Sequence, residues 1–109
     1  MPRGYSGMLL ENKSALNDSG TVGPNEVGDA DSINVTVEFG AGTSAGAVTV
    51  ESAGNAGYGG TWAQEAAVNW AAASRAHVVN IPGPRDSVRA RISTAIVGGT
   101  VNAKISVKK

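Results

Sequence analysis

The clearest pattern in the chain is a regular alternation of apolar and polar residues over two neighbouring segments, residues 87–97 and 100–107. Such alternation is typical of strands that bury one face. Between the two segments stands Gly98-Gly99, a pair that readily takes the positive φ angles of a two-residue hairpin turn. The pattern therefore predicts an antiparallel hairpin made of these two strands.

The predicted register of this hairpin places Ile92 opposite Ile105 and gathers all the apolar side chains on one face. A slip of one residue would turn that face to water, so the pattern fixes the register. The other face is basic, and Arg89 would lie across from Lys108 in an unfavourable like-charge pair. This face is suited to water or to an acidic partner, and its basic residues are Arg89, Arg91, Lys104 and Lys108.

The middle of the chain predicts further strands within residues 32–39, 47–51, 61–70 and 76–81. Strong helix formers occur between residues 63 and 75, so a helix is the competing interpretation there. The continuous alternation favours two strands with a disturbance near Gln64-Glu65. In total we expect about six to eight short strands at the spacing of a sandwich, which predicts an all-β antiparallel β-sandwich.

The first 31 residues do not follow this pattern. Residues 16–31 are rich in Gly, Asn, Asp, Ser and Pro, the residues of turns and loops, and so long a loop is uncommon within a compact domain. Met8, Leu9 and Leu10 form a short apolar run that fits either an edge strand or an arm that docks on a neighbouring subunit. We therefore expect an extended N-terminal arm over residues 1–31 and a β-sandwich domain over residues 32–109.

Composition limits how this domain is stabilised. The 109 residues suffice for one core, and with one Phe, two Tyr and two Trp the interior has to consist of Val, Ile and Ala. No cysteine is present, which excludes disulfides and thiolate metal sites. The N-terminus lacks the apolar run of a signal peptide and no segment has the length of a membrane span, so we expect a soluble protein without a targeting signal.

Charge is segregated along the chain although the net charge is zero. Residues 1–40 carry six acids and two bases (2 − 6 = −4), whereas residues 75–109 carry seven bases and one acid (7 − 1 = +6). Opposite charges at the two ends favour contacts between subunits, and two solvated surfaces are the alternative.

Catalytic chemistry has little support in the sequence. The only histidine, His77, shares a strand face with apolar residues, and no motif supplies a nucleophile for it. Three glutamates could form a carboxylate pair, but each falls at an outward strand position or a bend, so we expect them to be solvated: Glu38, Glu51 and Glu65. The acidic spacing of residues 28–32 faintly resembles a calcium loop without its glycine and its distal glutamate, and turn chemistry explains it better.

Two tryptophans are candidates for a binding surface or for the core. Trp62 and Trp70 could stack on a sugar, but in a chain with so few aromatic residues they are expected to be anchors of the interior. No aromatic residue is interleaved with the basic face of the predicted hairpin, which argues against nucleic-acid binding. We expect no cofactor and no metal.

Several strand and turn phrases occur between residues 60 and 105: Gly-Thr-Trp at 60–62, Val-Asn-Trp-Ala at 68–71, His-Val-Val-Asn-Ile-Pro-Gly-Pro at 77–84, Val-Arg-Ala-Arg-Ile at 88–92 and Gly-Gly-Thr-Val at 98–101. Through these phrases the chain resembles small virion proteins of tailed bacteriophages. The resemblance implies a capsid decoration, or cement, protein: a compact β-domain, commonly a homotrimer, on the outside of the shell where capsomers meet. It implies no functional residues, because that role is defined by surface placement.

The resulting hypothesis is a non-enzymatic subunit at the surface of a capsid, assembled in the host cytoplasm, whose N-terminal arm lies over neighbouring subunits. Its partners would be the major capsid protein or other virion subunits, with no membrane and no specific nucleic acid. Carbohydrate or receptor binding in a tail or fibre through Trp62 or Tyr58 is the alternative, and a small hydrolase is the least supported. The expected interface consists of the apolar run, the acidic arm residues and the basic residues that they would meet: Met8, Leu9, Leu10, Glu26, Asp29, Asp31, Arg89, Arg91 and Lys104.

Overall fold

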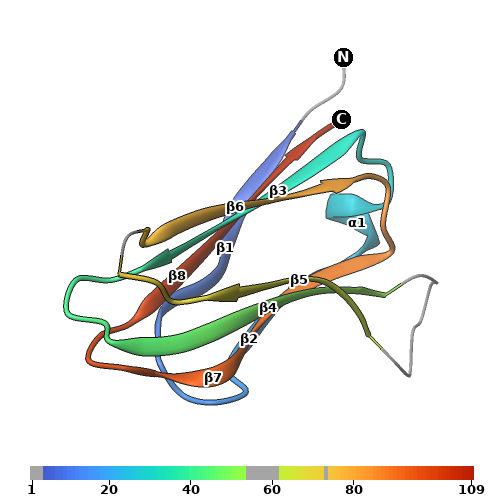
Figure 1. Ribbon diagram of the computed structural model, residues 1–109. Coiled ribbons are helices and arrows are strands. Elements are labelled where there is room, and N and C mark those ends of the chain that lie inside the picture. Colours follow the sequence, from blue (N-terminus) through green and yellow to red (C-terminus); the bar gives the residue numbers. More distant parts are fainter. Residues whose placement is uncertain (1–3, 54–61, 73) are drawn as a thin grey trace.

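The computed structural model describes residues 4–53, 62–72 and 74–109, and it confirms the all-β sandwich (Figure 1). All strand pairs within its two sheets are antiparallel. Sheet A has the strand order β1-β8-β3-β6 and sheet B the order β2-β7-β4-β5. The elements are β1 (Tyr5–Lys13), β2 (Ser19–Val22), α1 (Pro24–Val27), β3 (Ser32–Phe39), β4 (Ala45–Ala53), β5 (Ala63–Asn69), β6 (Ala76–Pro82), β7 (Ser87–Val97) and β8 (Val101–Lys108).

The core lies between the two sheets and is built from aliphatic side chains. Alternation along β3 shows how: every second residue is fully buried, and the residues between them are exposed or half-buried. The one large aromatic side chain that is fully buried among the described residues is Phe39. The other large, fully buried side chains are Leu10, Ile33, Ile81, Ile92 and Ile105.

The predicted hairpin is wrong, although both of its strands exist. β7 pairs with β2 and β4 in sheet B, whereas β8 pairs with β1 and β3 in sheet A. Ile92 and Ile105 both face the core, but from opposite sheets rather than from adjacent strands. Arg89 consequently has no like-charge partner in Lys108, and the predicted basic face is divided between the two outer surfaces of the sandwich.

A second connection that crosses between the sheets explains why β7 and β8 lie in different sheets. The β3–β4 connection also passes from sheet A to sheet B, and it is bonded to the ends of β7 and β8: Ser44 N donates to Val97 O at 2.8 Å and Gly40 N to Thr100 O at 2.7 Å. At the closest approach Gly42 and Gly98 both have positive φ, and a Cβ on Gly98 would lie 2.3 Å from the Gly42 carbonyl oxygen. Glycine is therefore needed here for a contact between two connections.

Most of the predicted arm belongs to the sandwich. β1 pairs with β8 at the edge of sheet A, and β2 pairs with β7 at the edge of sheet B. Leu9 and Leu10 are buried, and Val27 of α1 is fully enclosed. β1 and β2 approach each other so closely that a Cβ on Gly20 would meet the Leu9 carbonyl oxygen at 1.7 Å. These contacts make residues 5–27 part of the domain. Residue 31 therefore does not divide an arm from the sandwich.

The segment with competing interpretations is a strand. β5 pairs with β4, and the register shifts between Val50, which faces Ala66, and Glu51, which faces Gln64. Glu65 is the extra residue of this bulge, at the place where the alternation predicted a disturbance. The β5–β6 connection follows, and β6 returns to sheet A.

Candidate binding surfaces

The outer face of sheet A spans four paired strands. In-register pairing places four side chains in one row across the sheet, in the order Met8, Lys104, Thr36 and Val78. Met8 is 46% exposed and Val78 is 60% exposed. A hollow of about 490 Å³ lies in this face, lined by Met8, Thr36, Glu38, Asn102 and Lys104.

The outer face of sheet B carries a closed ionic cluster instead. Glu51 on β4 is nearly buried, with 10% of its side chain exposed, and its Oε1 accepts hydrogen bonds from Arg89 Nε at 2.7 Å and Arg91 Nε at 3.3 Å. Trp62 lies over the Arg89 guanidinium, whose carbon is 4.4 Å from the ring centroid. Arg91 also donates to Asn17 Oδ1 at 3.3 Å. The expectation of a solvated Glu51 is therefore wrong.

The pKa of Glu51 shows which influence prevails in this cluster. Burial of the carboxylate raises the pKa, but the hydrogen bonds and positive charges of Arg89 and Arg91 together outweigh it, so the pKa lies below its ordinary value. The carboxylate stays charged and neutralises much of the basic surface that the sequence predicted. Trp62 stacks on Arg89 and is only half-buried, so it is not the anchor of the core that we expected.

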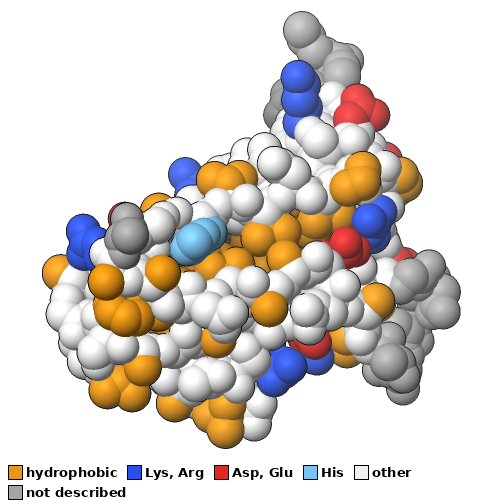
Figure 2. Space-filling model, viewed as in Figure 1, with side chains coloured by type: hydrophobic (Ala, Val, Ile, Leu, Met, Phe, Trp, Pro, Cys, Tyr) orange, Lys and Arg blue, Asp and Glu red, His pale blue; other side chains and the backbone are white. Residues whose placement is uncertain are grey.

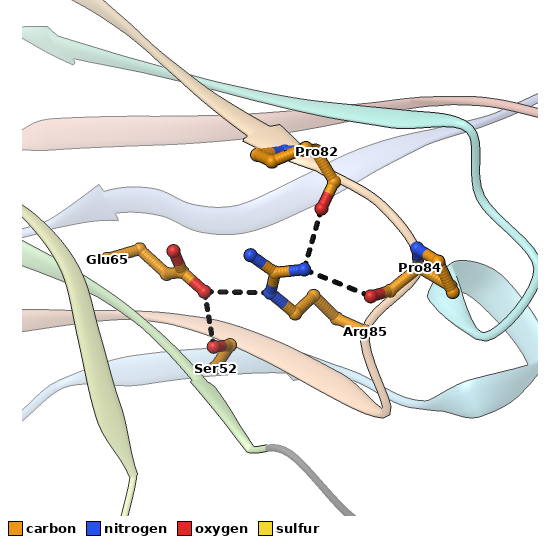
Figure 3. A network of polar contacts seen from close by, with 5 residues as sticks. All are labelled: Ser52, Glu65, Pro82, Pro84 and Arg85. Carbon is orange, nitrogen blue, oxygen red and sulfur yellow. Dashed lines mark hydrogen bonds and ion pairs between the residues drawn. The ribbon is translucent and has the colours of Figure 1, made fainter.

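A third site is an ion pair that joins β5 to the loop after β6 (Figure 3). Arg85 Nε donates to Glu65 Oε2 at 2.8 Å, and the same oxygen accepts from the Ser52 hydroxyl. The other arm of the guanidinium donates to the carbonyl oxygens of Pro82 at 2.6 Å and Pro84 at 3.1 Å. The hydrogen bond from Arg85 lowers the pKa of Glu65 more than burial raises it, and the Ser52 hydroxyl lowers it further.

Next to this bridge, apolar side chains are visible in a hollow between β6 and β5 (Figure 2). The histidine lies at the rim of this hollow. Trp70 and Val79 are partly buried and pack against the core there. His77 pairs with the buried Val37 and so faces the interior. Its Nε2 and the Nε1 of Trp70 are buried without a hydrogen-bond partner. This side is the open edge of the sandwich.

The structure separates the residues expected to form one interface. Met8 and Lys104 are cross-strand partners on the outer face of sheet A, whereas Arg89 and Arg91 lie on sheet B with Glu51. Leu9 and Leu10 are core residues.

The three acidic residues of the expected interface lie near the helix, away from that basic pair. Glu26 accepts a hydrogen bond from the Gly23 N–H at 2.9 Å, which caps the short helix α1, and Asp29 is 3.1 Å from Lys109 Nζ. Asp31 is exposed. Whether any of these residues contacts another subunit stays a prediction.

Three further sequence predictions concern a metal site, a membrane span and Tyr58. Within the described ranges, no group of three or more acidic or histidine side chains could hold a metal ion, and residues 28–32 form no such group. The part of the chain that the structure describes has no helix long and apolar enough to cross a bilayer. Tyr58, the second candidate for sugar stacking, lies outside the described residues.

Comparison with known proteins gives the fold a context. No protein-family model matches the chain, and no curated protein matches it. The SPBc2 prophage-derived protein YomS has a similar structure, with a TM-score of 0.68 and 11% identity, over 98% of this chain and 94% of that one. The Drosophila NLP core, whose structure is described as providing insight into pentamer formation and histone binding, has a TM-score of 0.52 and 18% identity, over 98% of this chain and 100% of that one. At these identities the likeness shows a shared fold.

Proposed function

We propose that this chain is a non-enzymatic structural subunit of a phage particle that binds the outer surface of the capsid and stabilises the shell. The observation that carries the proposal is the outer face of sheet A. It spans four paired strands, and it presents exposed apolar side chains in a row whose only charge is Lys104. Protein-binding surfaces combine apolar anchors with few charges at their centre.

The remaining surface supports this choice of face. On sheet B, Arg89 and Arg91 share the carboxylate of Glu51, so that a partner would have to disrupt existing ion pairs to engage them. The fold shared with a prophage-derived protein supports a phage setting for the subunit. The major capsid protein is then the partner we propose, and the capsid surface is the location.

Carbohydrate or receptor binding in a tail or fibre is less well supported. Sugar stacking needs an accessible aromatic face, and the Arg89 guanidinium lies over the Trp62 ring at 4.4 Å. A hydrolase would need a base beside a nucleophile, and His77 instead faces the interior at the open edge.

Binding of the purified full chain to shells that lack it tests the proposal. Met8→Glu replaces an exposed apolar side chain of the proposed contact by a charge, and the affinity should fall by at least about tenfold, as for an anchor residue. Leu16→Glu is the matched control, because Leu16 is a similarly exposed apolar residue, 54% against 46%, in the β1–β2 connection. It should bind as the unchanged chain does.

Two results would overturn the proposal. One is a chain that does not bind such shells but binds a glycan or the host surface, which would support the tail or fibre alternative. The other is an equal loss of shell binding in both variants, which would place the contact away from sheet A.

A further inference from the structure

The sandwich has four sheet edges, and three of them carry features that block pairing with another strand. β1 is interrupted by two register shifts and carries Glu11 and Lys13. β2 is only four residues long, and β5 is bent by the bulge at Glu65. Short length, bulges and charges are three of the devices by which proteins protect edges.

β6 lacks these three devices, and it carries proline, which also limits strand pairing, only at its last residue, Pro82. Its seven residues pair with β3 without a register shift, from Ser32 opposite Pro82 to Glu38 opposite Ala76. The strand contains no Asp, Glu, Lys or Arg, and Val78 at its centre is 60% exposed. We propose that β6 pairs edge to edge with β6 of a second copy of this chain about a two-fold axis at Val79, which joins two copies of sheet A into one continuous sheet.

The backbone groups that face the free edge can be read from the ladder. Phe39 N donates to Arg75 O at 2.8 Å, which makes these two residues a hydrogen-bonded pair between β3 and β6. Hydrogen-bonded pairs alternate along an antiparallel ladder. The odd-numbered residues of β6 therefore bond to β3, and Ala76, Val78 and Asn80 point their N–H and C=O groups to the free side.

A two-fold axis at Val79 matches these groups to their own copies. Val78 then faces Asn80 of the second copy, and each donates to the carbonyl oxygen of the other. Ala76 faces Pro82 of the second copy, and its N–H donates to the proline carbonyl oxygen, which has a second lone pair beside the one that accepts from Arg85 of its own chain. Pro82 has no N–H to return, but the Ala76 carbonyl already accepts a hydrogen bond from the Ser74 hydroxyl at 3.2 Å.

The axis at Val79 therefore leaves no carbonyl of the free edge without a donor. An axis at Asn80 would instead place the Val78 carbonyl opposite Pro82 and leave it without a donor. The register at Val79 places the missing proline N–H where no donor is needed.

Side chains and charge also suit a second copy. On the inner side His77 would face Ile81 of the second copy and Val79 its own counterpart, which covers side chains that are half-buried at the open edge. Contact between identical surfaces brings each charge near its own copy, and β6 has no fixed charge to oppose. Arg75 falls beside the end of the second copy's β6, where Glu65, Arg85 and Asp86 carry a net charge of −1 (1 − 2 = −1).

The mass of the full chain in solution, measured by analytical ultracentrifugation from micromolar to millimolar concentration, tests this inference. The unchanged chain should form dimers. Val78→Lys should raise the dimer dissociation constant at least about tenfold, because it places two ammonium groups close to the axis. Val97→Lys is the matched control, since Val97 is 53% exposed at the far end of β7, and it should dimerise normally. Thermal unfolding of both variants checks that they fold.

Amide hydrogen exchange supplies an independent readout. The N–H groups of Ala76, Val78 and Asn80 should exchange more slowly as the concentration of the unchanged chain rises, and this dependence should be lost in Val78→Lys. A monomer throughout the range, a trimer as the resemblance to decoration proteins implies, or equal weakening by both lysine variants would overturn the inference. Shell binding is not involved in either readout, so the proposed function stands or falls separately.

Discussion

Replacing Glu51 by glutamine removes one negative charge from a site where two guanidinium groups converge. The Arg89 and Arg91 contacts are 2.7 Å and 3.3 Å long, and 10% of the glutamate side chain is exposed. Losing one partner of a fully buried ion pair destabilises a protein by about 3–5 kcal/mol, and an exposed pair contributes about 0.2–1 kcal/mol. The two arginines are 24% and 29% exposed, so we expect Glu51→Gln to lower the free energy of unfolding by about 2 kcal/mol at neutral pH.

The loss should depend on pH in a defined direction. The pKa of Glu51 in the folded protein lies below the ordinary glutamate value of about 4.3. Its charge therefore stabilises the fold above that ordinary value, and this contribution disappears as the pH falls through the folded-state pKa. Denaturant unfolding of the unchanged chain and of Glu51→Gln should show a gap at pH 7 that closes towards pH 2.

The control for this experiment is Glu38→Gln. Glu38 is an exposed glutamate on sheet A, and its replacement should change the free energy of unfolding by less than about 0.5 kcal/mol. An equal loss at pH 7 and at pH 2, or a loss at pH 7 no larger than that of the control, would refute the reasoning about the Glu51 cluster.

Two further substitutions test the close approach of β1 to β2 and the bridge between Arg85 and Glu65. Gly20→Ala should destabilise the protein by about 1–3 kcal/mol in denaturant unfolding, because its Cβ would meet the Leu9 carbonyl oxygen at 1.7 Å. The control is Gly23→Ser, which should cause no loss of stability because a Cβ there would meet nothing closer than 3.9 Å. Equal effects of the two substitutions would contradict the close approach at Gly20. Arg85→Ala should reduce stability by about 1–2 kcal/mol, since it removes the bridge to Glu65. It should also speed amide exchange at Gly83 and at residue 85, whose N–H groups donate to Asp31 and Val27. Unchanged exchange would show that the bridge does not hold this loop.

The strands of this protein could be predicted from sequence because alternation directly reports burial of one face. Residues 32–39 and 87–97 were placed with the boundaries that β3 and β7 have, and the disturbance near Glu65 is the bulge in β5. Alternation contains no information on pairing partners. Ile92 faces the core whether β7 and β8 form a hairpin or lie in opposite sheets, so both arrangements satisfy the same pattern.

The choice between these arrangements depends on a contact far away in sequence. Gly42 and Gly98 approach each other where two connections cross between the sheets, and no local signal reveals that each glycine is there because of the other. The N-terminal segment was misassigned for a related reason. Residues 16–31 have loop composition, and their strand and helix are short enough that packing against β1 and β7 stabilises them rather than their own propensity.

The candidate sites divide in the same way. Met8 and Lys104 were both predicted to belong to an interface, and their position in one row follows from the register of β1 with β8. Glu51 occupies a polar position in an alternating strand, which predicts exposure; its burial results from arginines on the neighbouring strand β7 and from Trp62 above Arg89. The exposed edge of β6 depends on strand order, which the sequence pattern does not specify.

The central claim is that this chain acts by attaching to a capsid through the outer face of sheet A. Cryo-electron microscopy of phage particles that contain the chain tests the claim most directly. The account predicts density for the sandwich on the outside of the shell, with Met8 and Lys104 turned towards the capsid protein. Particles in which the chain occupies the tail, or shells in which sheet A faces the solvent and sheet B the capsid, would contradict it.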